Sequence, residues 1–279
     1  MLRRHAISLL VAGLAPRALD RFLAESRGAA LLVDARTRRL IAGSGLAVAG
    51  RFLAPPGSTL KPLVLAALVT SGRLTADESY VCPVSLRIGG RRLDCSHPPI
   101  DAPIRVETAL AYSCNCFVAH MAEQFAPREL AAALARAGLE APSGLTGGDE
   151  AGGRPEPVGA GDAQKLQALG EDHVWITAAG LANAYRLLAR SAPEAVRRGL
   201  EGAVNYGTAR NAQIRGAQVA GKTGSVLAPS GEQLAWFAGF MPSRDPEVVV
   251  TVMLRGRSGG GDAAPVAQRI LQAYRARQL

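Results

Sequence analysis

Ser58 and Lys61 form a pair whose types and spacing suit chemistry at a carbonyl group. Three positions apart, their side chains would share one face of a helix. A serine hydroxyl is a poor nucleophile until a base takes its proton, and lysine can be that base only where its surroundings destabilise its own proton. Because Ser58 follows a Pro-Pro-Gly sequence, it would sit at a helix start, where free N–H groups face a developing oxyanion. The alternative is that Ser58 only caps this helix and Lys61 is solvated.

Two further groups follow along the chain, Ser113-Cys114-Asn115 and Lys222-Thr223-Gly224. The alternative for the former is a junction between helices, at which Asn115 caps the next helix. The latter lies on a predicted strand, an unusual place for a lone lysine beside glycine. Lysine occurs at only three positions of a chain that otherwise uses arginine, and an ammonium can lose its proton where a guanidinium cannot. We therefore expect chemistry near Lys61 and Lys222, where lysine stands inside such a group.

The elements that must position these groups predict an α+β fold. Two strands come early and three come late, so we expect the termini to meet in one mostly antiparallel five-stranded sheet. Helices cover this sheet and form an inserted helical subdomain, and the Gly- and Pro-rich residues 143–161 form a long surface connection. Strands are predicted over 28–34, 39–43, 218–224, 234–241 and 247–254, and helices over 58–70, 104–112, 116–125, 128–137, 177–189, 194–204 and 265–275.

Length and composition fit one folded unit behind a short leader. Of 279 residues, 48% are apolar and 20% are charged, which excludes a disordered chain and suffices for one sizeable core. We assign residues 1–25 to an export signal or short leader and residues 26–279 to a single catalytic domain. Basic residues followed by the apolar stretch 6–15 are typical of an export signal, so we expect a periplasmic or cell-envelope location at the inner membrane. The alternative is an amphipathic first helix that runs on through Leu23.

The charge pattern bears on partners. The net charge is +9, but arginine and lysine are spread along the whole chain without a dense run. We therefore expect no binding of nucleic acid.

The four cysteines are Cys82, Cys95, Cys114 and Cys116. Cys82 and Cys95 flank a predicted hairpin, so we expect a disulfide between them. A four-ligand zinc site is the alternative; we disfavour it because neither cysteine pair has C-x-x-C spacing and no nearby histidine completes a set. The histidines, His97 among them, are interpreted as surface or core residues rather than as ligands or bases, and no metal is expected.

With their flanking residues, the three groups resemble the motifs S-x-x-K, S-x-N and K-T-G of the penicillin-binding, serine acyltransferase transpeptidase family. The resemblance extends from about residue 28 to residue 271. It includes the segments 55–62, 109–115, 207–209, 220–225, 235–240 and 260–266. It implies a D,D-transpeptidase that acts on D-Ala-D-Ala stem peptides of peptidoglycan, with β-lactams as inhibitors, no cofactor, and a separate glycan polymerase as a candidate partner.

The resemblance also assigns catalytic roles. Ser58 would attack the carbonyl between the two D-alanines, and Lys61 would accept its proton. Ser113 would relay a proton to the departing amine, and Asn115 would hold Lys61 and the substrate amide. From the chemistry we add that a positive charge on Lys222 would favour the neutral form of Lys61.

A second set of residues would bind the substrate. Lys222, Thr223 and Ser225 would bind its terminal carboxylate, and Gly224 would let it lie close against the strand. The backbone N–H groups of Ser58 and Ser225 would form the oxyanion hole. Ser225 departs from the family's usual threonine but keeps the hydroxyl.

Alternative functions share these residues. A D,D-carboxypeptidase passes the acyl group to water, a β-lactamase hydrolyses the drug adduct quickly, and a β-lactam sensor is not an enzyme. We disfavour the lactamase because no Glu-x-x-Leu-Asn segment lies between the second and third motifs, and Asn115 is polar where class D enzymes carry an apolar residue. With about 25 residues before the first strand, we expect neither a glycosyltransferase domain nor a pedestal.

Overall fold

The computed structural model describes residues 18–23, 28–228 and 230–279. The predicted export signal lies outside these residues. Within them, no helix combines the length and the apolar character that a membrane span requires.

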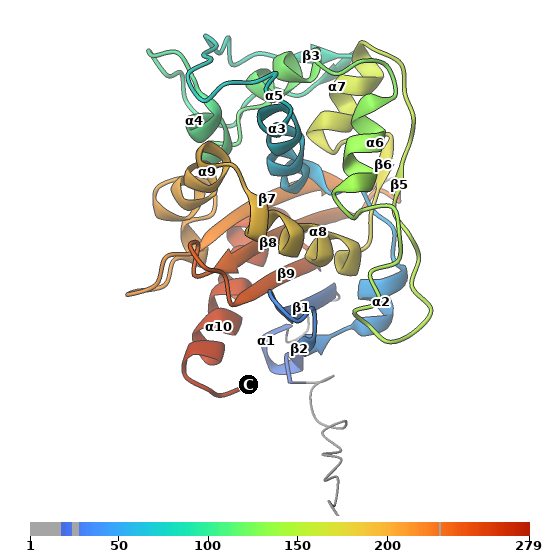
Figure 1. The fold of residues 1–279 in the computed structure, drawn as a ribbon, viewed down its shortest axis with the longest axis vertical. Coiled ribbons are helices and arrows are strands. Elements are labelled where there is room, and N and C mark those ends of the chain that lie inside the picture. The colour runs from blue at the N-terminus through green and yellow to red at the C-terminus, as the bar shows by residue number, and fades with distance from the viewer. Residues whose placement is uncertain (1–17, 24–27, 229) are drawn as a thin grey trace, which may run out of the picture.

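Five antiparallel strands form the central sheet, in the order β2-β1-β9-β8-β7 (Figure 1). Early strands therefore pair with late ones, which confirms the predicted α+β fold. The third motif lies on β7, which is an edge strand of this sheet. The strands are β1 (Gly28–Asp34), β2 (Leu40–Ser44), β7 (Ala220–Leu227), β8 (Gln233–Met241) and β9 (Val248–Arg255).

The sheet is buried on both faces, which is why β8 and β9 are almost continuously apolar. Along β8, Trp236 and Phe240 pack into the core shared with the inserted helices, whereas Phe237 packs into the core beneath α10 (Ala264–Arg275). Helix α8 (Ala178–Ser191) contacts β1, β8 and β9, and α10 contacts β8 and β9. Side chains alternate across the pleat, so each strand contributes to both cores.

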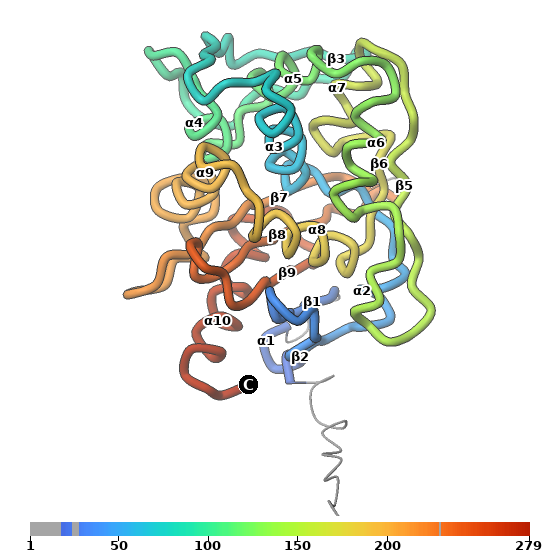
Figure 2. The backbone as a smooth tube through the Cα atoms, in the orientation of Figure 1, coloured from blue at the N-terminus to red at the C-terminus, as the bar shows by residue number. Residues whose placement is uncertain are grey.

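The chain between β2 and β7 forms the helical part, in which α3 to α7 lie on one side of the sheet and α2 lies against β1 (Figure 2). Two of its helices, α2 and α7, are absent from the sequence prediction. Both are short, at six and eight residues, and α7 lies between two glycines with positive φ, Gly161 and Gly170. Besides α8, the helices are α2 (Leu46–Arg51), α3 (Lys61–Thr70), α4 (Val106–Ala111), α5 (Asn115–Ala122), α6 (Glu129–Arg136), α7 (Asp162–Leu169) and α9 (Glu194–Asn205).

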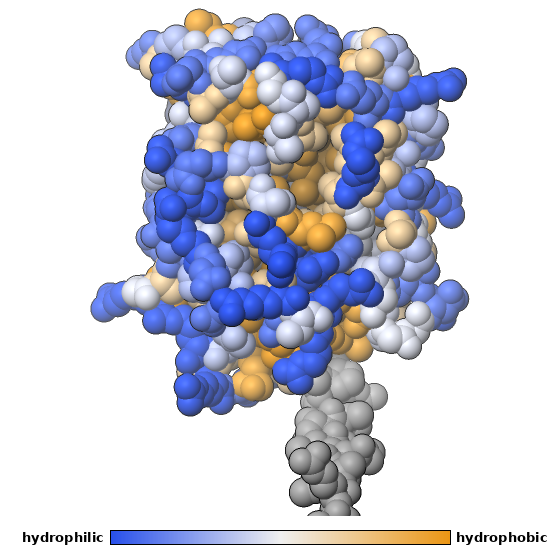
Figure 3. All heavy atoms as spheres, viewed as in Figure 1, coloured by the Kyte–Doolittle hydropathy of each residue, from blue (hydrophilic) through white to orange (hydrophobic). Residues whose placement is uncertain are grey.

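Short elements complete the fold. The predicted hairpin is present as β3 (Arg87–Ile88) and β4 (Arg91–Arg92), and β5 (Arg154–Pro155) pairs with β6 (Val174–Trp175). Helix α1 (Asp20–Leu23) precedes the sheet. Hydrophilic side chains dominate the face in Figure 3, and a hollow of about 350 Å³ lies between α3, α6 and α8.

Candidate active site

Ser58 lies on a single 3-10 turn, η2 (Gly57–Leu60), and Lys61 begins α3 directly after it. The sequence predicts one continuous helix here, but residues at i and i+3 eclipse on a 3-10 turn, so the two side chains still share a face. Gly57 permits the turn because its φ is +54°, and its N–H donates to the Gly170 carbonyl at 2.9 Å. Deeper in the core, the Tyr185 hydroxyl donates to the Thr59 carbonyl at 2.8 Å. Ser58 is thereby presented on a rigid support.

Lys61 is fully buried and reaches the second motif. Its Nζ donates to the Ser113 carbonyl at 2.7 Å and to the Asn115 side-chain oxygen, and it lies 3.3 Å from the Ser113 hydroxyl. Among the described residues, no hydrogen bond joins Lys61 to the Ser58 hydroxyl. The Lys61 amine is therefore held by Ser113 and Asn115 of the second motif and is not hydrogen-bonded to the proposed nucleophile, Ser58.

Ser113 occupies the junction between α4 and α5 with φ at +59°, a left-handed conformation that a serine rarely adopts. Hydrogen bonds hold the junction in this conformation, from the Ser113 N–H to the Leu110 carbonyl at 3.3 Å and from the Cys114 N–H to the Ala109 carbonyl at 2.8 Å. The side chain that caps α5 is Cys114 and not Asn115, because the Cys114 sulfur accepts the Phe117 N–H. Asn115 is thus free to bind Lys61.

The third motif meets the second at the Ser113 hydroxyl. The Nζ of Lys222, also fully buried, donates to this hydroxyl at 2.9 Å and to the Thr223 carbonyl at 3.1 Å. The Thr223 hydroxyl donates to that of Thr208 at 3.0 Å, and Ser225 is exposed and accepts the Gly259 N–H at 3.0 Å. Two lysines that are 161 positions apart in the sequence therefore share one hydroxyl.

Strand β7 packs directly against the turn that carries Ser58. A Cβ on Gly224 would lie 2.6 Å from the Pro56 carbonyl oxygen, and a Cβ on Gly57 would lie 3.4 Å from the Ser225 nitrogen. The glycine of the third motif is therefore required by this close packing. The same packing places the backbone of Gly57, the neighbour of Ser58, beside that of Ser225 at the outer edge of the sheet.

Burial sets the charge of the two lysines. Desolvation lowers the pKa of Lys61 to about 8, because a charged ammonium is poorly stabilised in this interior. Desolvation also lowers the pKa of Lys222 well below its usual range, and repulsion from Lys61 adds to that effect. We expected the charge of Lys222 to lower the pKa of Lys61. Instead, repulsion between the two lysines lowers the pKa of Lys222, and burial is the main cause of the lowered pKa of Lys61.

Comparison with known proteins identifies the family. The family model of the penicillin-binding protein transpeptidase domain matches residues 28–272. The chain belongs to this family. It is therefore a peptidoglycan transpeptidase, and the resemblance drawn from the three motifs is confirmed. The search of curated proteins finds no match.

Solved structures share the fold of this transpeptidase at low identity. PBP2 of Pseudomonas aeruginosa, in complex with WCK 5153, is 22% identical with a TM-score of 0.79, over 92% of this chain and 73% of that one. The transpeptidase domain of penicillin-binding protein 3 from Burkholderia pseudomallei is 22% identical with a TM-score of 0.80, over 94% of this chain and 91% of that domain. PBP2 of Helicobacter pylori, in a complex with MreC, is 17% identical with a TM-score of 0.80, over 94% of this chain and 63% of that one.

The cysteines of the transpeptidase depart from the sequence prediction. The four thiols are free, and the Sγ atoms of Cys82 and Cys95 lie 3.7 Å apart, so the expected disulfide is not formed. The hairpin pattern brings these two cysteines together, as predicted. It gives no sign that Cys114, at the start of α5, comes equally close to both of them, at 3.5 Å from Cys82 and 3.7 Å from Cys95. His97, which we did not expect to be a ligand, also joins this group.

One further residue near the catalytic motifs, Glu171, was not found from the sequence. Glu171 follows Gly170, which contacts the Ser58 turn, and burial raises the pKa of its carboxyl although Arg91 pairs with it at 3.1 Å. No motif marks this residue, and the only hint in the sequence is the glycine at position 170, which has a positive φ in the structure.

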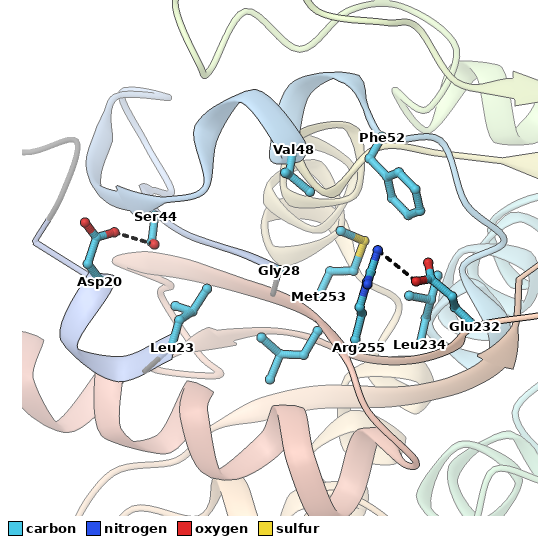
Figure 4. Close-up of a pocket in the computed structure, with 11 residues that line it drawn as sticks. Asp20, Leu23, Gly28, Ser44, Val48, Phe52, Glu232, Leu234, Met253 and Arg255 are labelled. Atoms are coloured by element: carbon cyan, nitrogen blue, oxygen red, sulfur yellow. Dashed lines mark hydrogen bonds and ion pairs between the residues drawn. The ribbon is translucent and has the colours of Figure 1, made fainter. Parts of the chain in front are cut away.

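An apolar pocket of about 480 Å³ lies away from the three motifs (Figure 4). It is lined by residues of α1, β1, β2, α2, β8 and β9, with Val48 and Phe52 exposed above Met253. Asp20 and Ser44 are hydrogen-bonded at one end, and Arg255 pairs with Glu232 at 2.7 Å at the other. None of its lining residues belongs to the catalytic motifs, so we assign it no part in the reaction.

Proposed function

We propose that this transpeptidase works through an acyl-serine intermediate on D-Ala-D-Ala stem peptides. The Ser58 oxygen bonds to the carbonyl carbon between the two D-alanines while its proton passes to neutral Lys61. The C–N bond then breaks, and Ser113 relays a proton from Lys61 to the departing amine of the terminal D-alanine. An amine of a second stem peptide attacks the ester and gives up its proton by the same route, which completes the crosslink and frees Ser58.

One observation carries this proposal: the Ser113 hydroxyl lies between the Nζ atoms of Lys61 and Lys222, at 3.3 and 2.9 Å. A hydroxyl in this position can accept a proton on one side and donate one on the other. The lowered pKa of Lys61 supports its use as a base near neutral pH.

Substrate binding follows from the edge strand. An edge strand presents unpaired N–H and C=O groups that an extended peptide can pair with. We assign the terminal carboxylate to Lys222, Thr223 and Ser225, and the oxyanion to the N–H groups of Ser58 and Ser225. Each such N–H donor is commonly worth roughly a hundredfold or more in rate.

Acylation by a labelled penicillin tests the nucleophile. Intact-protein mass spectrometry should show one adduct that maps to Ser58, and Ser58→Ala should show none. A Ser71→Ala variant, changed at the end of α3, is the matched control and should acylate normally. Normal acylation of the Ser58→Ala protein would refute the assignment.

The fate of the acyl group separates the alternatives. With a cell-wall pentapeptide and an amine acceptor, a transpeptidase yields crosslinked product and a D,D-carboxypeptidase yields trimmed peptide. Rapid loss of the penicillin adduct would instead indicate a β-lactamase, and a lasting adduct without turnover of peptide a sensor. We propose amine transfer, since the family is named for it.

We further propose that the enzyme acts after export, at the cell-envelope face of the inner membrane, beside a separate glycan polymerase. Its substrate lies in that compartment. One structure with the same fold, 22% identical, belongs to a peptidoglycan synthase complex that coordinates polymerization and crosslinking. Fractionation of cells that express a tagged full-length chain, followed by crosslinking and mass spectrometry, would test both points.

A further inference from the structure

A cluster of sulfur and imidazole groups lies directly behind the second motif. The Sγ atoms of Cys82, Cys95 and Cys114 and a ring nitrogen of His97 lie within 4.8 Å of one another. The exposed fractions of these four residues are 9, 8, 0 and 6%. Four buried thiol and imidazole groups at one point are the ligand set of structural zinc sites.

The distances match a tetrahedron better than they match a disulfide. Cys82 and Cys95 are 3.7 Å apart, Cys95 and Cys114 3.7 Å, and Cys114 and Cys82 3.5 Å, measured between Sγ atoms. The Nε2 of His97 lies 3.8 Å from the Cys82 sulfur. With Zn–S bonds of about 2.3 Å, the corners of a tetrahedral site are about 3.8 Å apart. Three nearly equal S–S distances also favour no single pair for a bond of about 2.05 Å.

The surroundings hold these groups as ligands. The His97 Nδ1 lies 2.8 Å from the Pro98 carbonyl, which needs an N–H at that nitrogen and so leaves Nε2 free to bind a metal. Backbone N–H groups point at each sulfur: Val84 at Cys82 at 3.3 Å, Asn115 at Cys95 at 3.2 Å, and Phe117 at Cys114 at 3.3 Å. Such hydrogen bonds stabilise thiolates, as does the position of Cys114 at a helix N-terminus.

We propose that Cys82, Cys95, His97 and Cys114 bind one structural Zn²⁺. On binding, the three thiols release their protons to solvent, four bonds to zinc form, and nothing is oxidised or reduced. Cys116 is not a member of the group of four; its sulfur lies 3.5 Å from Cys95 and contacts the Ser85 carbonyl at 3.8 Å. Cys116 is therefore a cysteine beside the site that can be replaced as a control without removing a proposed ligand.

The site would fasten the β3–β4 hairpin to the start of α5. The hairpin already holds Asn115, whose side-chain amide donates to the Leu93 carbonyl at 2.9 Å. Because Asn115 in turn holds Lys61, zinc would fix the geometry of the second motif. This consequence rests on the proposed function, whereas the binding of zinc does not.

Metal analysis of the purified full-length protein tests the site. We expect about one zinc per chain and, after replacement by Co²⁺, a thiolate-to-cobalt charge-transfer band in the near ultraviolet. Cys82→Ser and His97→Ala should lose more than about tenfold in zinc affinity against a competing chelator, while Cys116→Ser should keep its zinc. The wild-type measurements stand even if a ligand variant fails to fold.

Other outcomes would overturn the proposal. Wild-type protein that holds no zinc and takes up no Co²⁺, or whose mass is two hydrogens lower because Cys82 and Cys95 are joined, would refute the site. Iron or copper in place of zinc would refute the choice of metal. Penicillin acylation, measured before and after zinc removal, should slow and recover on re-addition of zinc. A metal-loaded protein that never acylates would refute the proposed function and leave the zinc site standing.

Discussion

At the scale of single residues, the charge of Lys61 governs when Ser58 can react. Its pKa is lowered to about 8 by burial, and only the neutral amine can accept a proton. The rate of acylation should therefore rise about tenfold per pH unit below pH 8 and level off above it. Stopped-flow acylation by a chromogenic β-lactam between pH 6 and pH 9.5 measures this profile. A rate already constant from pH 6 upwards would contradict it.

From the position and burial of Lys222 we predict that the enzyme prefers substrates with a free terminal carboxylate. Burial and Lys61 lower its pKa, and an anionic carboxylate beside Nζ would counteract this by stabilising the ammonium. A stem-peptide analogue with a terminal amide should lose roughly ten- to a hundredfold in kcat/KM, since a charge-assisted hydrogen bond is worth about 1.5–3 kcal/mol.

The Lys222→Ala variant is the control for this comparison. It should be slow with both analogues and discriminate little between them, because the partner of the carboxylate is gone. If the variant still prefers the carboxylate by the full factor, another residue binds that group.

At the scale of elements, the contact between the Ser58 turn and β7 decides whether the site can assemble. A methyl group on Gly224 would lie 2.6 Å from the Pro56 carbonyl oxygen, a backbone atom that cannot move without moving the turn. We expect Gly224→Ala to lower the free energy of unfolding by about 1–3 kcal/mol and to slow acylation strongly.

A matched variant separates this contact from the general effect of glycine. A Cβ on Gly159 would meet nothing within 4 Å, so Gly159→Ala should acylate at the wild-type rate. Urea unfolding and penicillin acylation measure both variants. Equal acylation by the two proteins would show that the close contact is unimportant.

The long elements were predictable because their apolar periodicity reflects burial. Strands β1, β8 and β9 and helices α8 and α10 agree with the sequence to within about two residues. Ser58 and Lys61 could be paired from local spacing alone. The 3-10 turn could not be foreseen, because the Gly170 carbonyl that accepts the Gly57 N–H at the start of this turn lies more than a hundred residues away in the sequence.

The meeting of the cysteines shows a second limit of sequence patterns. Local spacing joins Cys82 and Cys95 through a hairpin, but Cys114 approaches them only because α4 and α5 pack beside that hairpin. That Lys61 and Lys222 lie close together could be predicted only from the resemblance to a family. Both the cysteine cluster and this pair of lysines depend on tertiary packing, which the spacing of residues in the sequence does not encode.

At the scale of the whole molecule, the sheet separates two hydrophobic cores, and we expect them to have different roles in stability and catalysis. The core beneath α10 contains Ile270 and lies on one face, whereas Leu110 belongs to the core on the other face and its carbonyl accepts the Ser113 N–H. Both side chains are fully buried. Stability should therefore depend on both cores, and catalysis mainly on one.

Ile270→Ala and Leu110→Ala test this division of roles. Each should lower the free energy of unfolding by about 2–5 kcal/mol, the usual cost of such a truncation in a packed interior. Only Leu110→Ala should slow acylation of the folded protein, by about tenfold, because the junction that holds Ser113 would shift. Urea unfolding gives the stabilities, and acylation well below the unfolding transition gives the rates. If Ile270→Ala slowed acylation equally, the sheet would have to transmit strain from one core to the other, since no residue of the three motifs contributes to the core beneath α10.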